Sequence, residues 1–223
     1  MAARLTPPPG VAGRAGAAVA AGALLTASAV VFASSLAPSL HSRYLPWITG
    51  RSLGIASYVC LWALVGLGLA MRHPWRARLR FAHPESLLRA HVLLGTATVT
   101  LVVAHVAFLA SDRYAGVGWL GAVVPGMSHY RTGAVALGVL SLFLLVLIAA
   151  TARFAGRRGT RHWLAFHRLA AVTFVLVWLH GVLAGTDTAA LRLVYLATAT
   201  VLLVLAGSRA LAAAGDARAG SAP

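Results

Sequence analysis

Two strongly apolar segments of this chain each carry a pair of histidines. His91 and His105 bracket "HVLLGTATVTLVVAH", and His167 and His180 bracket "HRLAAVTFVLVWLH". An ionisable side chain inside a membrane span is costly and marks a functional site by default. One such histidine is explained equally well by a hydrogen bond to a neighbouring helix. Four histidines in two pairs favour a shared site.

The two pairs lie at matched depths. His91 and His167 each follow the start of their segment by four residues, and His105 and His180 each lie six residues before the first residue after their segment. At 1.5 Å per residue the two levels are about 20 Å apart. One imidazole from each segment at each level provides the two axial nitrogens of a six-coordinate haem iron. This pattern predicts two haems.

The angular positions around the helix fit this interpretation for His91 and His105 but not for His167 and His180. On an ideal helix, fourteen residues return to within about 40° of the starting face, whereas thirteen leave His167 and His180 about 140° apart. The second segment therefore requires a local distortion, or haems that approach it from different sides. Zinc fits less well, because it prefers four ligands and the spans offer no thiolate or carboxylate beyond Cys60. We expect the remaining histidines in solvated loops or at helix ends: His41, His73, His83, His129 and His162.

The composition is that of a membrane protein. Of the 223 residues, 60% are hydrophobic and 10% are charged, whereas soluble domains have about 25% charged residues. All nineteen basic residues are arginines, against four acids, for a formal charge of +15. The arginines form short clusters between apolar runs, which is typical of loops that face anionic lipid and cytosol. We expect the lipid bilayer as a partner and no nucleic acid.

Six segments are long and apolar enough to span a bilayer, which takes about 20 residues. They predict an all-α integral membrane bundle over residues 15–208, between cytoplasmic tails 1–14 and 209–223. The spans are 15–38, 52–71, 87–110, 132–152, 163–185 and 189–208. The stretch "DRYAGVGWLGAVVPGMSHYR" is too short and too broken by Gly and Pro to span, and Trp119 and Tyr130 suit an interfacial loop or half-helix. Segment 15–38 resembles a signal peptide, but it is long for one, and we expect a retained helix.

The distribution of arginines predicts the orientation. With the N-terminus inside, the outer side holds five arginines and the inner side the remaining fourteen. The outer five are Arg43, Arg51, Arg113, Arg131 and Arg192. This positive-inside bias predicts a multi-pass protein of the cell membrane with both termini cytoplasmic.

The histidine-bearing segments resemble the ferric reductase-like transmembrane domain, shared by NADPH oxidases, ferric reductases and the bacterial haem-binding subunit of methionine-sulfoxide reductase systems. Supporting matches are "TGRSLG" before the second span, "YR" (Tyr130, Arg131) before the fourth and "AGTD" after the fifth. The likeness covers residues 45 to about 210. It implies two b-type haems, an inner one held by His91 and His167 and an outer one held by His105 and His180.

The resemblance also implies cations for the haem propionates. Arg89 and Arg168 are placed to serve the inner haem, although ordinary positive-inside anchoring explains them equally well. Arg51 is a candidate for the outer haem and is more telling, because an outer arginine opposes the topology bias. Phe174 lies between the two levels, where packing explains it better than coupling of the haems.

The chain lacks a GxGxxG motif after a strand and a phosphate loop, so we expect no flavin or nicotinamide site in it. Electrons then come from a quinol or from a separate reductase that docks on the inner loops. They pass to ferric iron, oxygen or an outer redox protein. Whether the chain is itself an oxidoreductase or the electron-carrying subunit of one stays open.

Two other functions compete with this hypothesis. The first is a haem-free transporter in which intramembrane histidines pass a metal ion or protons. No Asp or Glu lies within any predicted span, however, and such pathways usually use carboxylates. The second is a purely structural assembly subunit, which leaves the matched histidine levels unexplained.

Overall fold

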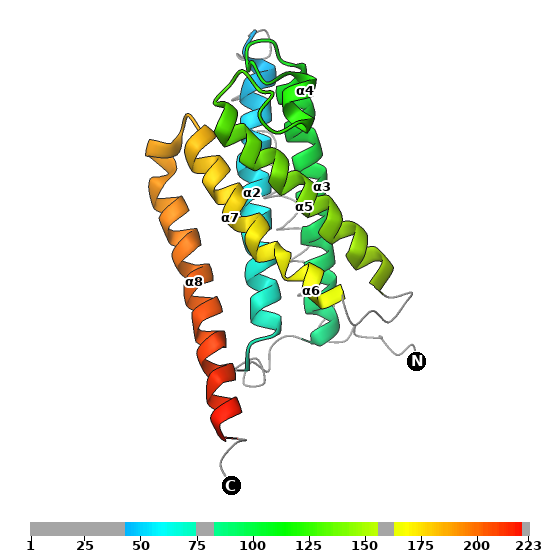
Figure 1. The fold of residues 1–223 in the computed structure, drawn as a ribbon, viewed down its shortest axis with the longest axis vertical. Coiled ribbons are helices and arrows are strands. Elements are labelled where there is room, and N and C mark those ends of the chain that lie inside the picture. Colours follow the sequence, from blue (N-terminus) through cyan, green and yellow to red (C-terminus); the bar gives the residue numbers. More distant parts are fainter. Residues whose placement is uncertain (1–42, 75–82, 156–162, 220–223) are drawn as a thin grey trace, which may run out of the picture. The chain divides into compact units, whose positions relative to one another are not determined.

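The computed structural model describes residues 43–74, 83–155 and 163–219, and all regular secondary structure in them is helical. The chain divides into two compact units, Met1–Leu45 and Pro46–Pro223, and the helices belong essentially to the second. They are α2 (Leu45–Met71), α3 (Pro84–Ser111), α4 (Gly118–Val123), α5 (Thr132–Ala155), α6 (Trp163–His167), α7 (Leu169–Ala184) and α8 (Thr188–Ala219) (Figure 1).

Five spans in the described residues are long and apolar enough to cross a membrane, with α6 and α7 together forming one of them. The expected all-α membrane bundle is therefore confirmed. The expected span 15–38 and the tail 1–14 lie outside the described residues. The last helix runs on to Ala219, so the segment expected as a tail from residue 209 is largely a continuation of that helix.

Helix α2 begins at Leu45, earlier than the predicted start at residue 52. Pro46 is compatible with this start, because the first turn of a helix needs no N–H donors and proline fixes a helical φ. The extension adds about two turns and brings Gly50 and Arg51 into the helix. Both residues belong to the candidate site described below.

The fifth predicted span is interrupted at Arg168, between α6 and α7. The N–H of Ala171 donates to the carbonyl of Arg168 three residues earlier (3.2 Å) instead of following the α-helical pattern. The segment "FHRLA" contains neither glycine nor proline, so the local sequence does not predict the break. The interruption falls between His167 and His180, where their thirteen-residue spacing requires a distortion.

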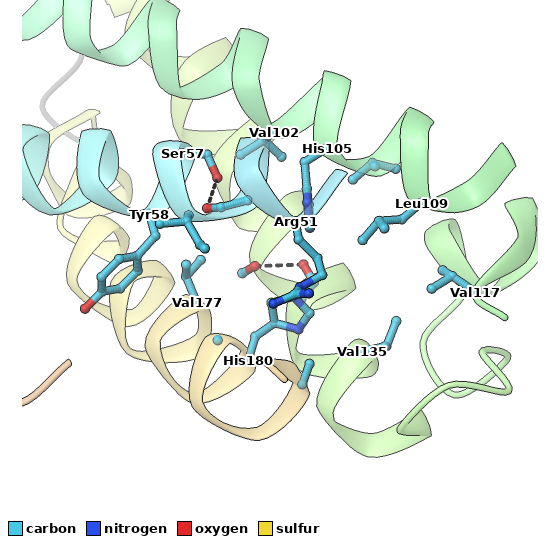
Figure 2. A pocket seen from close by; sticks show the side chains of 18 of the residues that line it. Arg51, Ser57, Tyr58, Val102, His105, Leu109, Val117, Val135, Val177 and His180 are labelled. Carbon is cyan, nitrogen blue, oxygen red and sulfur yellow. Dashed lines mark hydrogen bonds between the residues drawn. The ribbon is translucent and has the colours of Figure 1, made fainter. Parts of the chain in front are cut away.

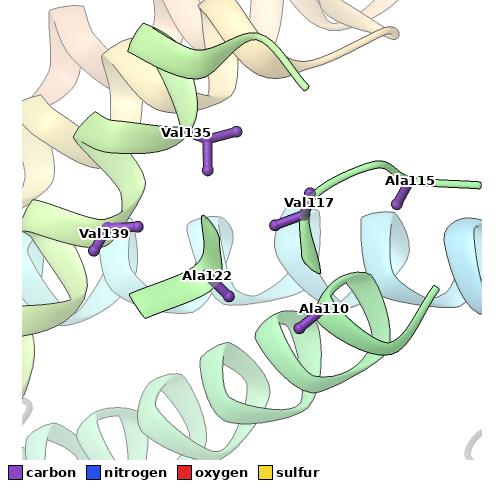
Figure 3. Close-up of a cluster of buried hydrophobic side chains, with 6 residues drawn as sticks. All are labelled: Ala110, Ala115, Val117, Ala122, Val135 and Val139. Atoms are coloured by element: carbon purple, nitrogen blue, oxygen red, sulfur yellow. The ribbon is translucent and has the colours of Figure 1, made fainter. Parts of the chain in front are cut away.

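Two apolar clusters lie in the part of the bundle that the structure describes. One joins the end of α3, the α3–α4 connection, α4 and the first turns of α5 (Figure 3). Its buried members are Ala110, Ala115, Val117, Ala122, Val135 and Val139. The other cluster joins α2, α7 and α8 and includes Phe174, whose ring stacks on that of Tyr58 at 5.9 Å. Phe174 is thus a packing residue, as the sequence favoured.

Hydrogen bonds tie α8 to α2 and α7. The Tyr58 hydroxyl bonds with the Thr198 hydroxyl, and the indole nitrogens of Trp62 and Trp178 donate to the carbonyls of Thr198 and Tyr195 (3.2 and 3.0 Å). His73 differs from expectation. It is buried, and its Nε2 lies 3.1 Å from the Ser208 hydroxyl, so it joins the segment just after α2 to α8 rather than facing solvent.

Candidate functional site

The structure brings the four intramembrane histidines together in the two expected pairs. The ring centres of His91 (α3) and His167 (α6) lie 5.9 Å apart, and those of His105 (α3) and His180 (α7) lie 6.5 Å apart. The ring planes are inclined to each other by 56° in the first pair and 78° in the second. Each pair therefore joins two helices that are distant in sequence.

Backbone carbonyls orient the rings of His105 and His180. Nδ1 of His105 donates to the carbonyl of Gly50 on α2 (2.6 Å), and Nδ1 of His180 donates to that of Ala134 on α5 (2.8 Å). In a neutral imidazole the other nitrogen, Nε2, is then the one with a free lone pair. Such a hydrogen bond fixes the tautomer and the ring direction of a metal-binding histidine and makes it a stronger ligand.

Glycines provide the space for these rings. A Cβ on Gly54 would lie 2.7 Å from His105, and one on Gly138 would lie 2.8 Å from His180. Gly54 lies four residues after Gly50, whose carbonyl accepts from His105, and Gly138 lies four residues after Ala134, whose carbonyl accepts from His180. The ring thus rests on a helix turn without a side chain, close enough to reach the backbone.

The pair of His91 and His167 is built differently. Nδ1 of each ring is buried and has no hydrogen-bond partner in the described part of the chain. A Cβ on Gly68 of α2 would lie 3.2 Å from His91, a looser fit than at Gly54. Trp163 lies flat against His167, with ring centres 5.3 Å apart and planes inclined by 12°. Its indole nitrogen is likewise buried without a partner among the described residues.

The separations within both pairs suit a metal ion between the rings. An imidazole nitrogen binds a metal such as zinc at about 2.0–2.1 Å, which puts two rings on opposite sides of one ion about 6.4 Å apart, centre to centre. The observed 5.9 and 6.5 Å bracket this value. No cluster of three or more His, Cys, Asp or Glu forms a metal site among the residues that the structure describes. Two imidazoles at this separation would suit haem, whose macrocycle supplies the remaining ligands.

A largely apolar pocket surrounds His105 and His180. Figure 2 shows Arg51 from α2, His105 from α3 and His180 from α7 projecting into it. Aliphatic side chains such as Val102, Leu109 and Val135 line its walls, and Tyr58 lies at its edge. An apolar wall with a few convergent polar groups is the usual lining of a cofactor site.

Arg51 and Asp187 are the two residues of opposite charge that line this pocket. The guanidinium of Arg51 forms an ion pair with the carboxylate of Asp187, just after α7, and lies over the ring of Trp47 at 4.2 Å. Arg51 is 23% exposed and Asp187 is 44% exposed. The sequence suggested Arg51 as an anion partner, but it did not suggest that an acidic side chain already engages it.

Asp187→Asn is expected to change stability little, because exposed ion pairs contribute only about 0–1 kcal/mol. Thermal unfolding in detergent would measure this, with Arg51→Gln and the double variant completing a cycle. A coupling energy well above about 1 kcal/mol would show that the pair is a structural element rather than a displaceable contact.

Arg89 and Arg168, the cations expected beside His91 and His167, are both exposed. A further cation, Arg72 just after α2, lies close enough to His167 for its charge to act on that ring. Arg72 was not predicted from the sequence, because it lies far along the chain from both His91 and His167.

The glycine supports were also missed, although the sequence holds a signal for them. Gly54 and Gly68 are fourteen residues apart, as are His91 and His105. The two helices run in opposite directions, so Gly54 meets His105 and Gly68 meets His91. Equal spacing on consecutive antiparallel helices is a pattern that sequence alone can reveal.

Comparison with protein families gives one match. The family model described as "Ferric reductase like transmembrane component" matches residues 53–178, more than half of the chain. The matched region contains His91, His105 and His167 and ends two residues before His180. Among curated proteins and solved structures, no significant match is found.

Proposed function

Since the chain belongs to the ferric reductase-like transmembrane component family, we propose that it is a di-haem b-type cytochrome that carries single electrons across the membrane. The observation that carries this proposal is the pairing of four histidines, with ring centres 5.9 and 6.5 Å apart, on three segments of the bundle. Under the orientation expected from the arginines, His91 and His167 hold the cytoplasmic-side haem, and His105 and His180 hold the outer one.

Haem supplies the one-electron chemistry when it is bound, and the chain sets ligation, polarity and access. Nε2 of His105 and Nε2 of His180 would be the ligand atoms at one level, because both Nδ1 atoms donate to carbonyls. The lining of this site is largely apolar. The polarity around a haem influences its reduction potential, and fixed histidine rings would limit reorganisation.

Arg51 is the proposed partner of a propionate at the His105 and His180 level. Its ion pair with Asp187 is only partly buried, so a second carboxylate can compete for the guanidinium at modest cost. For the other level we retain Arg89 and Arg168 as proposed propionate partners and add Arg72, which acts on His167.

The electron donor is proposed to be a separate reductase or a membrane quinol, and the acceptor ferric iron, oxygen or an outer redox protein. In this arrangement the chain is the membrane subunit of an oxidoreductase. We propose the cell membrane as its location, with both termini in the cytoplasm, from the excess of arginines in the expected inner loops.

Haem analysis of the purified protein tests the function. A pyridine haemochrome assay should give two haem b per chain. Proteoliposomes with ferricyanide inside should oxidise a membrane-impermeant reductant outside, and empty liposomes should not. A colourless preparation that cannot be loaded with haem would contradict the proposal, and transport of zinc or protons by it would favour the transporter hypothesis.

A further inference from the structure

Side chains from elsewhere satisfy the carbonyls at the end of α7. The last turn of a helix leaves its carbonyls without intrahelical partners, and such groups are costly at membrane depth. The Arg131 guanidinium donates to the carbonyl of Leu183 (2.6 Å), and the Tyr130 hydroxyl donates to that of Ala184 (2.8 Å). The Thr188 hydroxyl lies 2.8 Å from the carbonyl of Val182 and 3.0 Å from that of Gly185. The end of α7 is thus fully capped.

Arg131 adopts an unusual backbone conformation to make this contact. Its φ is +37°, and it is the one non-glycine residue with positive φ in the described part of the chain. An L-residue other than Gly, Asn or Asp rarely occupies this region. Such strain persists where surrounding contacts impose it, often at functional sites.

The turn that carries Tyr130 and Arg131 is itself fixed. The Ser128 hydroxyl accepts from the N–H of Tyr130 (3.1 Å) and lies 3.0 Å from the carbonyl of Tyr130. The Thr132 hydroxyl donates to the carbonyl of Ser128 (2.8 Å). The side chains of Tyr130 and Arg131 therefore project from a turn that is held in place by hydrogen bonds.

The same short stretch also contacts His180. Ala134, three residues after Arg131, provides the carbonyl that accepts from Nδ1 of His180 (2.8 Å). Residues 130–134 thus contact α7 at His180 and again three to five residues later. Two contacts one turn apart fix both the rotation and the depth of a helix end.

We propose that Tyr130 and Arg131 are positioning residues for His180: they clamp the end of α7 so that Nδ1 of His180 reaches the carbonyl of Ala134. This inference rests on the proposed function, in which Nε2 of His180 is a haem ligand. A hydrogen bond from Nδ1 to a carbonyl makes the imidazole a stronger donor and favours ferric iron. Loosening the clamp should therefore raise the reduction potential of one haem.

The test uses Tyr130→Phe and Arg131→Lys, which remove the hydroxyl donor and the planar fork without changing charge. Arg131→Asn is a third variant, because asparagine tolerates a positive φ but cannot span the same distance. All three should bind two haems per chain. Potentiometric titration should show one component shifted to higher potential and the other unchanged. The ferric low-spin EPR signal of the shifted component should change as well.

Arg113→Gln is the matched control, since it removes an exposed arginine from the nearby α3–α4 connection. It should leave both the EPR signals and the separation of the two potentials unchanged. Potentials and EPR signals in the clamp variants that equal those of the wild type would overturn the positioning role. An equal shift of both components would overturn it too.

A haem-free measurement separates this inference from the proposed function. Wild-type protein that binds no haem contradicts the function alone. In that case ¹⁵N spectra of histidine-labelled protein report the Nδ1 hydrogen bond of His180 directly, with His180→Gln for assignment. Loss of that hydrogen bond in Arg131→Asn supports the clamp, and its retention overturns it.

Discussion

His105→Ala is expected to remove one of the two proposed haems and leave the other, which halves the b-type absorbance per chain. The ring of His105 lies 6.5 Å from that of His180, centre to centre. The other two paired histidines, His91 and His167, lie at the other level and cannot replace it. A haem with one axial histidine and no partner on the opposite face loses much of its binding free energy. His180→Ala should give the same spectrum as His105→Ala.

Double variants make this prediction sharper, because groups that act as a unit are not additive. His105→Ala with His180→Ala should lose no more haem than either alone. His105→Ala with His91→Ala should lose both haems. His129→Ala, an exposed histidine before α5, is the control and should retain two. The remaining haem in each single variant reports that the bundle is still folded. Full loss of haem in His105→Ala, or none, would contradict the pairing.

Gly138→Ala is expected to expel the His180 ring from its position and to cost about 1–3 kcal/mol of stability, the usual penalty of overpacking. The added methyl would lie 2.8 Å from Cε1 and Nδ1 of His180, closer than carbon atoms pack. The ring must then turn, or α5 and α7 must separate, and either movement breaks the hydrogen bond to Ala134. We expect loss of the haem at this level and a lower unfolding temperature.

The glycines offer a graded series for this experiment. Gly54→Ala should resemble Gly138→Ala, because its methyl would lie 2.7 Å from His105. Gly68→Ala should be milder, since the distance to His91 is 3.2 Å. At Gly133, on the same helix as Gly138, an added Cβ meets nothing within 4 Å. Gly133→Ala should therefore leave haem binding and the unfolding temperature close to those of the wild type, because no neighbouring atom opposes the added methyl. An equal effect at Gly133 and Gly138 would refute the steric argument.

The sequence predicts five of the spans and the closeness of the paired histidine rings well, because both depend on local patterns. Apolar length decides which segments are helices, and position along a helix decides depth. His91 and His167 could thus be paired without knowledge of the helix packing. The same reasoning left an angular mismatch between His167 and His180, and the break at Arg168 lies where that mismatch demanded a distortion.

Features that depend on contact between helices were not predicted. The caps from Tyr130 and Arg131 join residues more than fifty positions apart, and no local pattern indicates which carbonyl a side chain reaches. His73 was expected in solvent because it follows a span, yet Ser208 on α8 meets it. The ion pair of Arg51 with Asp187 likewise depends on how α2 lies beside the end of α7.

The continuity of α3 has a consequence for how lipid composition affects the protein. His91 and His105 lie on one unbroken helix, so the rise of an α-helix, about 21 Å over fourteen residues, sets the separation of the two levels. A thinner or thicker bilayer is accommodated by tilt of the spans rather than by stretching them. Because electron hopping depends steeply on distance, the electron transfer proposed between the two levels should proceed at nearly the same rate in short-chain and long-chain lipids.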